Sequence, residues 1–306
     1  MTNKTGKMTL ERKNINLLAG FQKNVLAWLM LVPCVMSFAI FVWGPILQGM
    51  WISLFQTKGF ETVKFIGLEN YISVVSDSLF LKSLVNSVKY VFWSLIIGLP
   101  LPVITAIAIN ELFRGKGFFK FAIYLPAMVP AIAASLLWTI LYEPSAGGFL
   151  NMLISKIGMA PCGWLQNDKA TIPLIVITMT WGGFGSTTLL YLANLQSVNQ
   201  ELYEAAELDG AGVFRKCFNI TFPHMKGLIS MLAIMQIINV FNIFQQPLAM
   251  TGGGPNNASI TLTMTAYNYA FQYFQTGRAS AVSVLTGLML MIFSIIYFKV
   301  QKNDEA

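Results

Sequence analysis

Long apolar runs alternate with short polar segments along the whole chain. The first run covers residues 24–57 and contains no Asp, Glu, Lys or Arg. About 20 mostly apolar residues suffice to cross the hydrocarbon core of a bilayer, and longer charge-free runs are typical of membrane helices. The pattern recurs five more times. The sequence therefore predicts an all-α membrane protein with six transmembrane helices, over residues 25–54, 90–110, 121–142, 171–195, 227–247 and 279–298.

The last third of the chain needs a separate interpretation. No charged side chain occurs between Gly227 and Gly277, which is far more than one helix requires. The middle of this region, "TGGGPNNASITLTMTAYNYAFQYFQTG", is rich in Gly, Thr, Asn and Gln. Consecutive glycines followed by a proline would leave backbone groups unpaired in lipid. We therefore expect this segment to lie outside the hydrocarbon core or against protein, with the sixth helix starting near Ala279.

Composition and charge support a membrane location and predict an orientation. The chain is 55% hydrophobic and 11% charged, whereas soluble proteins carry about 25% charged residues. With six spans, 13 of the 20 Lys and Arg residues lie on the side of the two termini and 7 on the other. Basic residues favour the cytoplasm, so cytoplasmic tails are predicted at 1–24 and 299–306. A secretory signal has a much shorter apolar region than the first run.

The sequence offers little for catalysis. His224 is the only histidine, and the three cysteines lie far apart and form no metal-binding pair, so no catalytic residue and no metal site are expected. The glycine-rich segments lack the spacing of a phosphate-binding loop, so any ATP hydrolysis belongs to another chain. No ionisable side chain lies inside the six ranges, which argues against a proton-driven carrier. The net charge of +7 is explained by topology and anionic lipid, without a nucleic-acid partner.

A polar segment at residues 201–227, "ELYEAAELDGAGVFRKCFNITFPHMKG", separates the fourth and fifth apolar runs. Its first nine residues favour a helix with acidic side chains in the first turn, which suits the helix dipole. Gly210 then permits a tight turn, a second short helix follows, and Pro223 opens the fifth span. Such a helix–turn–helix is either a docking element for a partner's groove or an amphipathic connection. The physical chemistry of the residues leaves both interpretations open.

The stretch "EAAELDGAGVFRKCFNITFP" is similar to the cytoplasmic EAA signature of permease subunits in binding-protein-dependent ABC importers. Cys217 and Phe222 depart from the usual aromatic and leucine at their positions. The resemblance implies that residues 201–223 form the coupling helix that sits in a cleft of an ATP-binding subunit. The residues that match the signature are Glu204, Ala205, Ala206, Asp209, Gly210, Ala211, Ile220, Thr221 and Pro223.

Further segments resemble the first of the two permeases in carbohydrate importers, among them "NELFRGKGFFKFAIYLP", "TWGGFG" and "AMTGGGPNNAS". This resemblance implies a sugar substrate, a heterodimer with a second permease in the bacterial inner membrane, two ATP-binding subunits and an extracytoplasmic solute-binding protein. ATP and Mg would be used by those partner subunits, and this chain would bind no cofactor. The alternatives are an importer for a non-sugar solute, an ATP-independent carrier or channel, and a membrane enzyme or scaffold.

A substrate path is expected on two helices. Gln236, Asn239, Ile243 and Gln246 fall at helical spacing on the fifth predicted span, where three amides would line one face. They either bind sugar hydroxyls or hold helices together. By the resemblance, the "WGGFGS" stretch contributes contacts with sugar. Its candidate residues are Trp181, which either stacks on a sugar ring or packs against protein, Gly183 and Ser186.

The resemblance also assigns the loop between the last two spans to the binding-protein side. Its candidate contact residues are Gly252, Gly253, Gly254 and Pro255. Glycines permit close backbone approach. The loops 55–89 and 143–170 are further candidate docking surfaces, with simple helix connection as the alternative.

Overall fold

A computed structural model of the protein describes residues 25–112 and 114–304, and the chain divides into two compact units, residues 1–52 and 53–306. The predicted tail 1–24 lies outside the described residues. The first unit contains α2 (Val25–Phe38), a π-helical turn η1 (Ala39–Trp43) and α3 (Gly44–Ile52). Its residues Trp28–Ile52 are long and apolar enough to cross a membrane.

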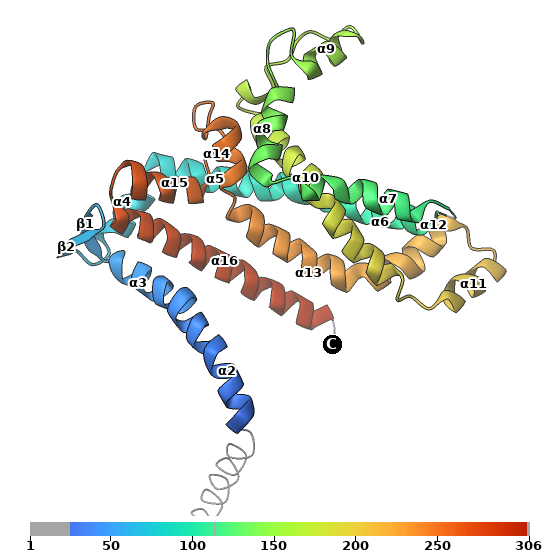
Figure 1. The fold of residues 1–306 in the computed structure, drawn as a ribbon, viewed down its shortest axis with the longest axis horizontal. Coiled ribbons are helices and arrows are strands. Elements are labelled where there is room, and N and C mark those ends of the chain that lie inside the picture. Colours follow the sequence, from blue (N-terminus) through green and yellow to red (C-terminus); the bar gives the residue numbers. More distant parts are fainter. Residues whose placement is uncertain (1–24, 113, 305–306) are drawn as a thin grey trace, which may run out of the picture. The chain divides into compact units, whose positions relative to one another are not determined.

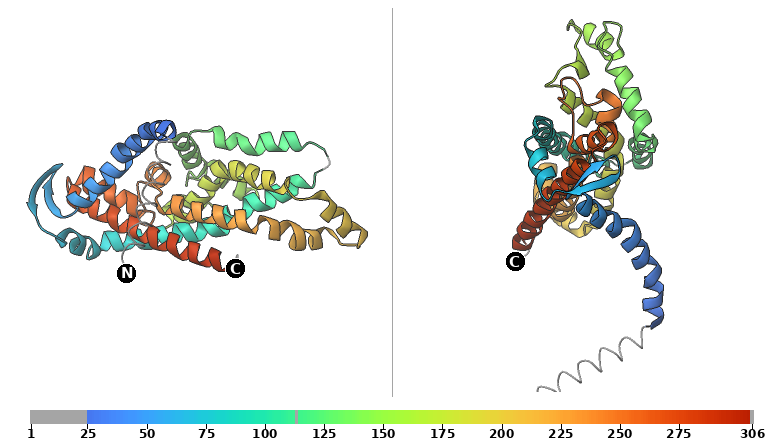
Figure 2. Two further views of the ribbon diagram at one scale, coloured as in Figure 1. Left: turned by 90° about the horizontal axis from the view of Figure 1, so that it is seen from below. Right: turned by 90° about the vertical axis from the view of Figure 1, so that its left-hand side faces the viewer.

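Four long helical runs form the body of the second unit (Figure 1). The first joins α5 (Ser78–Trp93), η2 (Ser94–Gly98) and α6 (Pro100–Asn110), and the second is α10 (Thr171–Leu195). The third joins α12 (Val213–Lys216), η5 (Cys217–Thr221) and α13 (Phe222–Phe241), and the fourth is α16 (Thr276–Asp304). Within this unit α13 and α16 lie side by side (Figures 1 and 2).

The third predicted span, 121–142, is not one straight helix. The chain forms α7 (Lys116–Tyr124), η3 (Leu125–Met128) and α8 (Ala131–Leu141), and the two halves meet at 93°. Val129 is extended, with ψ 127, because a residue before proline is pushed out of the helical region. Within the described residues, five helices are long and apolar enough to span a membrane, or six if this bent pair counts as one.

Several predicted boundaries differ from the observed ones. The second long run starts at Ser78 rather than residue 90, and Lys82 within it donates to the backbone carbonyl of Asn256. The run that contains α13 covers Val213–Phe241 instead of 227–247, and the chain then turns into α14 (Gln245–Thr251). The last helix starts at Thr276 rather than 279.

The expectation of an all-helical protein is wrong for residues 55–65. These residues form an antiparallel hairpin of β1 (Phe55–Lys58) and β2 (Glu61–Phe65), in which Phe55 pairs with Phe65. The two rings make an edge-to-face contact with centroids 5.3 Å apart. The hairpin is tied to the start of α16, since Thr276 Oγ1 donates to the Gly59 carbonyl at 2.7 Å. The predicted loop 55–89 therefore contains a regular hairpin, and its role as a docking surface stays a prediction.

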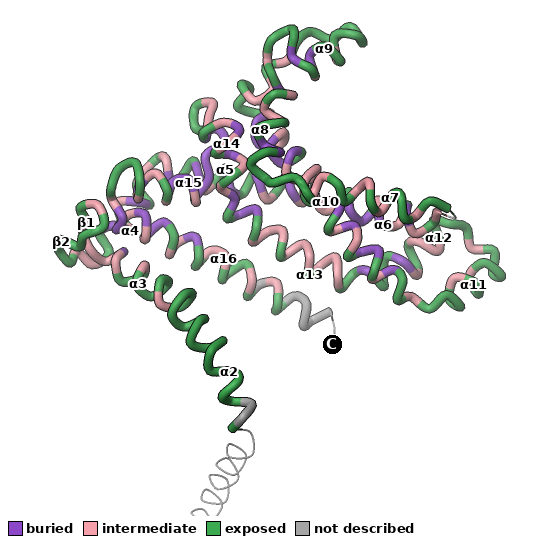
Figure 3. Tube along the Cα trace, in the orientation of Figure 1, coloured by how far each residue is buried: buried purple, intermediate pink, exposed green. Residues whose placement is uncertain are grey.

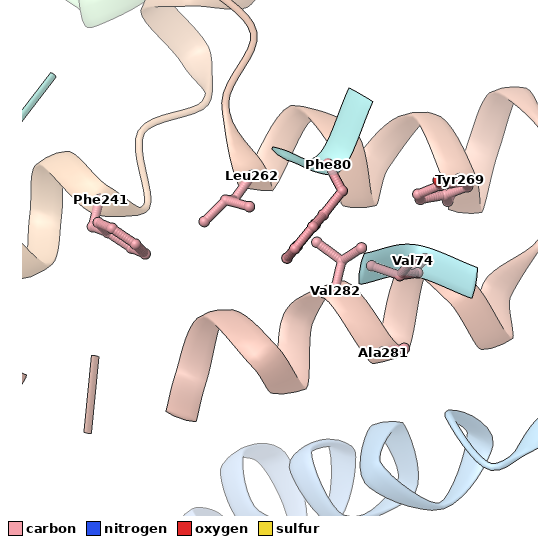
Figure 4. Packing of buried hydrophobic residues seen from close by; sticks show 8 residues of the cluster. Val74, Phe80, Phe241, Leu262, Tyr269, Ala281 and Val282 are labelled. Atoms are coloured by element: carbon pink, nitrogen blue, oxygen red, sulfur yellow. The ribbon is translucent and has the colours of Figure 1, made fainter. Parts of the chain in front are cut away.

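Buried side chains follow α5, α10, α15 (Leu262–Tyr267) and the start of α16 (Figure 3). In one cluster, Phe80, Leu262 and Val282 converge, with Val74 of α4 (Glu69–Val75) and Tyr269 of η6 (Asn268–Gln272) beside them (Figure 4). The uncharged segment after α13 was expected to lie either outside the hydrocarbon core or against protein. It packs against protein.

Tyr269 also fixes the start of α5. Its hydroxyl donates to Asp77, whose other carboxylate oxygen accepts from the Leu79 amide at 2.8 Å and caps the helix. Burial, and then the hydrogen bond to the Asp77 carboxylate, raise the pKa of Tyr269. The phenol therefore remains a neutral donor, and its bond to the helix cap persists across the physiological pH range.

The segment 143–170 is organised by one buried amide. It contains α9 (Phe149–Ser155) and η4 (Trp164–Gln166). Asn151 Nδ2 donates to backbone carbonyls on both sides of α9, including those of Ser145 at 3.0 Å and Cys162 at 3.2 Å. Its Oδ1 accepts from Trp164 Nε1 at 2.8 Å. Asn151 thus holds an irregular loop together where no sheet or long helix does so.

Candidate functional site

The polar segment between α10 and α13 begins with a well-capped helix. In α11 (Gln200–Leu208), the Asn199 side chain accepts from the Glu201 amide at 3.0 Å. At the other end Gly210 has φ +74; its amide bonds to the Glu207 carbonyl at 3.0 Å and the Ala211 amide bonds to the Ala206 carbonyl at 2.9 Å. This pair of bonds is the Schellman ending of a helix, which requires a left-handed residue and favours glycine there.

The second short helix predicted after Gly210 is not a separate element. Residues Val213–Phe241 form one continuous helical run, in which the π-helical turn Cys217–Thr221 leads into α13. Pro223 lies in the first turn of α13 and does not start a new span. The segment is therefore one short helix and a tight turn, attached directly to a long helix.

Two side-chain contacts tie α11 to the base of that long helix. The hydroxyls of Tyr203 and Thr221 are 2.9 Å apart and hydrogen-bonded. Lys216 Nζ lies 2.6 Å from a carboxylate oxygen of Glu207. The Glu207 side chain of this ion pair is 62% exposed, so solvent screening limits what the pair contributes to stability. The Tyr203 contact reaches the buried Thr221. These two contacts attach α11 to the start of the long helix.

The surface of α11 and α12 carries apolar side chains that no other described part of the chain covers (Figure 3). Leu208 is 91% exposed and Phe214 is 82% exposed. An apolar patch with a polar rim marks a surface for a partner. Of the signature residues, Glu204, Ala205, Asp209, Gly210 and Pro223 are exposed, Ala206, Ala211 and Ile220 are half-buried, and Thr221 is buried.

A cavity of about 230 Å³, which we call cavity A, lies between η2, α6, α10 and α13. It is lined mainly by apolar side chains and contains a small number of polar ones, which is the usual make-up of a small-molecule site. No Asp, Glu, Lys, Arg or His lines it. Its polar residues are Ser94, Thr180, Thr187, Gln236 and Asn239.

The four residues predicted to share one helix face do not do so. Gln236 and Asn239 line cavity A, but α13 ends at Phe241. Ile243 lies beyond that end and is only 5% exposed, within the core. Gln246 belongs to α14 and lines a different cavity. The helical spacing held for two of the four positions, because the break after Phe241 reorients the chain.

Gln236 holds helices together as well as lining cavity A. Its Nε2 donates to the backbone carbonyl of Ser94 at 2.8 Å and to the Ser94 hydroxyl oxygen at 2.5 Å. A Cβ on Gly98 would lie 2.6 Å from the same nitrogen, so glycine there permits the close approach. Asn239, by contrast, is exposed and makes no side-chain hydrogen bond to any described residue.

Of the three candidate substrate residues in the "WGGFGS" stretch, one lines cavity A. Gly183 lines cavity A. Trp181 lines neither cavity, and its ring lies edge-on to Trp138 with centroids 5.9 Å apart, so packing against protein is what the structure shows. Ser186 is exposed on α10 and also lies away from both cavities.

The glycine loop after α14 is held from the side by α5. Asn86 Nδ2 donates to the carbonyls of Asn257 and Ile260, at 2.9 and 3.1 Å, and Tyr90 Oη donates to the Ser259 carbonyl at 3.2 Å. Gly253 is buried, whereas Gly252 is exposed. Sequence reasoning missed these α5 residues, because contacts between positions about 170 apart leave no local signal.

The outermost residues of this loop are asparagines. Asn256 and Asn257 are both exposed and both have positive φ, 46 and 57. Asparagine tolerates this conformation better than other residues with a side chain. The two consecutive asparagines after Pro255 are the sequence feature that could have predicted this turn.

Several long apolar helices, a charge-free cavity between them and an exposed helical projection define a multi-pass membrane transport protein. The chain belongs to the family described as binding-protein-dependent transport system inner membrane components, whose sequence profile matches residues 98–303.

Relatives with this organisation match almost the whole chain. The trehalose/maltose transport system permease protein of Thermococcus litoralis is 33% identical over 92% of this chain and 95% of its own. A probable ABC transporter permease protein of Bacillus subtilis is 32% identical over 93% of this chain and 98% of its own. The arabinooligosaccharide permease protein of the same organism is 30% identical over 91% and 89%.

A solved structure shows the same fold. A bacterial ABC transporter involved in the import of the acidic polysaccharide alginate superposes with a TM-score of 0.83, over 94% of this chain and 99% of the other, at 22% identity. A bacterial alginate ABC transporter in complex with an alginate pentasaccharide-bound periplasmic protein gives a TM-score of 0.81 over 92% and 95% of the two chains. The fold is therefore that of an ABC importer permease.

Proposed function

We propose that this chain is the first permease of the pair in an ATP-driven importer that carries a sugar or oligosaccharide across the bacterial inner membrane. The observation that carries the proposal is the similarity to the trehalose/maltose permease protein along 92% of the chain. The few amides and hydroxyls in the lining of cavity A support it, because such groups pair with sugar hydroxyls.

The proposed topology has six spans, with the bent α7–α8 pair counted as one, and both termini in the cytoplasm. The excess of Lys and Arg on that side supports it. The 201–223 segment then faces the cytoplasm as the EAA coupling element, and the loop after α14 faces the outside. The exposed apolar side chains of α11 and α12 support a protein partner at that surface.

The partners we propose are a second permease, two ATP-binding subunits that use ATP and Mg, and an extracytoplasmic solute-binding protein. The family description, which names a binding protein, supports the last of these. In the proposed cycle, closure of the ATP-binding subunits displaces α11 and opens the path toward the loaded binding protein. Such a shift requires that the closed subunits contact α11 differently from the open ones.

The structure offers a physical link for this coupling. The Tyr203–Thr221 and Glu207–Lys216 contacts attach α11 to the helical run that starts at Val213. The same run carries Gln236 to cavity A. At 1.5 Å per residue this distance is roughly 35 Å. One continuous helical run therefore joins the projection to cavity A.

Reconstitution tests the proposal. The chain is purified with the subunits that accompany it and placed in proteoliposomes with its binding protein. Uptake of radiolabelled maltose, trehalose and arabinotriose is then measured with ATP, without ATP and with a non-hydrolysable analogue. We expect uptake of at least one sugar only with ATP. Uptake without ATP would identify a carrier or channel, and a chain purified without an ATPase would contradict the importer.

A further inference from the structure

A further cavity, which we call cavity B, shares no lining residue with cavity A. It has a volume of about 260 Å³ and is bounded by the β1–β2 hairpin, α4 and the start of α16, which lie together at one end of the second unit (Figure 1). Among the described residues that line it, Ile66 alone is apolar. Its lining includes two charged side chains, Glu69 and Arg278, whereas that of cavity A includes none.

Hydrogen bonds hold the walls of cavity B in place. Asn70 Nδ2 donates to the carbonyls of Ser53 and Phe55, both at 2.8 Å, and so joins α4 to the hairpin. The Gly277 amide donates to Thr57 Oγ1 at 2.9 Å, which joins the hairpin to α16. The cavity is therefore formed before any ligand enters it, and a preorganised site lowers the cost of binding.

Two amide oxygens of the lining have no donor. Gln275 Oε1 is buried and has no hydrogen-bond partner among the described residues. Asn70 is only 6% exposed. Both partners of its Nδ2 are carbonyls, which fixes the orientation of the amide, and its Oδ1 accepts from no described residue. A buried acceptor without a donor is costly, so these oxygens suit a ligand that carries N–H or O–H groups.

Glu69 and Arg278 add opposite charges to the same cavity. Within the described residues neither forms an ion pair, whether with the other or with a third side chain. Arg278 lies in the first turn of α16, where the positive end of the helix dipole disfavours a cation. An anionic group beside the guanidinium would offset this and form charge-assisted hydrogen bonds. The cavity therefore suits a molecule with both a positive donor group and an anionic group.

Cavity B also lies where two candidate spans begin. α4 ends three residues before the span Ser78–Asn110. Arg278 is the third residue of the span Thr276–Lys299. The ends of spans lie at the level of the polar lipid headgroups. A headgroup can therefore reach the cavity from the bilayer, and a free molecule of the same chemistry can reach it from water past the exposed Glu69.

We propose that cavity B binds a small zwitterion with a primary ammonium group and a phosphate or carboxylate, either as the headgroup of phosphatidylethanolamine or as a free molecule. The ammonium donates to Asn70 Oδ1, Gln275 Oε1 and the Glu69 carboxylate. The anionic group accepts from Arg278. The volume is just below the range of about 300–1,000 Å³ that is usual for drug-sized ligands, which suits so small a group. This site is separate from the transport proposed above and does not depend on it.

The first test compares ligands on the wild-type protein. The chain is purified with its accompanying subunits, delipidated in detergent and titrated calorimetrically with dihexanoyl forms of phosphatidylethanolamine, phosphatidylcholine and phosphatidylglycerol. We expect phosphatidylethanolamine to bind about tenfold or more tightly than the other two, because phosphatidylcholine has no N–H on its nitrogen and phosphatidylglycerol has no ammonium. Equal binding of phosphatidylcholine, or no binding of any of the three lipids or of the soluble zwitterions below, overturns the proposal.

Titration with phosphoethanolamine and glycine distinguishes the two sources of the zwitterion. If either binds as tightly as the dihexanoyl phosphatidylethanolamine, a free zwitterion is the ligand. If binding requires the acyl chains, the lipid is the ligand. Both results support a zwitterion site.

The second test changes the two charged ends of the cavity. Arg278→Gln removes the partner of the anionic group, and Glu69→Gln removes the charge at the exposed rim. Each should weaken binding of phosphatidylethanolamine by about tenfold or more. Lys58→Gln is the matched control, because Lys58 is an exposed cation of the same hairpin that lies outside the lining. Wild-type affinity in either assembled cavity variant overturns the proposal.

Gln275→Met separates ligand binding from a purely structural role. It removes an acceptor that has no donor within the described chain, so the variant without ligand should unfold at the same temperature as wild type or higher. It should nevertheless bind phosphatidylethanolamine several-fold more weakly. A lower unfolding temperature together with unchanged affinity overturns the role of this oxygen.

A protein contact is the remaining interpretation of cavity B. If no zwitterion binds and Arg278→Gln weakens only the association of the solute-binding protein, the cavity is a protein contact and the zwitterion site is wrong. Because titration does not require uptake, its result does not decide whether the transporter imports a sugar, and a failure of the importer proposal leaves the zwitterion site intact.

Discussion

Two polar segments interrupt this apolar chain, at residues 199–221 and 251–262. Their sequences share several features, but the apolar side chains of the first are exposed and those of the second are buried. Both contain a glycine with positive φ at a helix end, Gly210 in one and Gly252 in the other. In the first, apolar side chains such as Leu208 are exposed. In the second, residues such as Ile260 and Leu262 are almost completely buried.

The difference lies in what each segment is bonded to. The 251–262 segment is held by α5 at successive turns, through Lys82, Asn86 and Tyr90, all of which donate to its carbonyls. Among the described residues, the longer-range side-chain contacts of the 199–221 segment lie within the segment itself, between Tyr203 and Thr221 and between Lys216 and Glu207. One interruption is therefore part of the protein's core, and the other is a lightly anchored surface available to a partner.

The largest expected effect is on the anchored segment. Asn86→Leu removes the donor to two carbonyls in a buried position. Each buried group left unpaired costs about 1–3 kcal/mol, so we expect a marked fall in the thermal unfolding midpoint of the purified transporter. Lys89→Gln, one turn along on an exposed position, is the control and should change little. Equal stability of the Asn86 variant would show that α5 does not anchor the loop.

The second effect concerns the lightly anchored segment. We expect it to change how ATP hydrolysis is coupled to sugar uptake. Gly210→Val forces a β-branched residue into the left-handed region, at a strain of about 1–3 kcal/mol. We expect ATP hydrolysis to continue while sugar uptake is lost, with the subunits still assembled. Gly212→Val is the matched control, because Gly212 is also exposed and open but has φ −67. Normal sugar accumulation by the Gly210 variant would refute this role.

The smallest effect tests the link between α11 and the long helix. Tyr203→Phe removes one hydrogen bond to Thr221, worth about 0.5–1.5 kcal/mol. We expect a modest loss of uptake per ATP hydrolysed, with little change in unfolding temperature. A double-mutant cycle with Thr221→Val isolates the pair. If the two single variants add independently, the contact does not transmit the movement.

Sequence patterns located the elements whose physics is local. The absence of charge in residues 171–195 marked the helix that the structure has as Thr171–Leu195. Residue order in 201–210 predicted both α11 and the turn at Gly210. In each case neighbouring residues determine the outcome: uninterrupted apolar side chains in the first, and a helix ending that requires positive φ in the second.

Features that depend on distant residues were missed or misplaced. The predicted loop 55–89 included Lys82 and Asn86, which lie on α5 and donate to carbonyls of the loop after α14. The predicted face from Gln236 to Gln246 ignored the break at Phe241. The cavity that Gln246 lines is formed by residues from 127 to 246, so periodicity within one helix gives no sign of it. The roles assigned to the 201–223 residues, and to Gly252–Pro255 as a contact surface, stay predictions.

Gly183 and Gly185 should differ in the substitutions that they tolerate under selection for growth. In a library that replaces Gly185 with every residue, growth on sugar should be lost throughout, since even alanine meets the Ile123 carbonyl. A library at Gly183 should instead retain growth for many side chains, since an added Cβ there meets no atom within 4 Å. Tolerance at position 185 would therefore report how closely α10 packs on α7, and tolerance at position 183 would not.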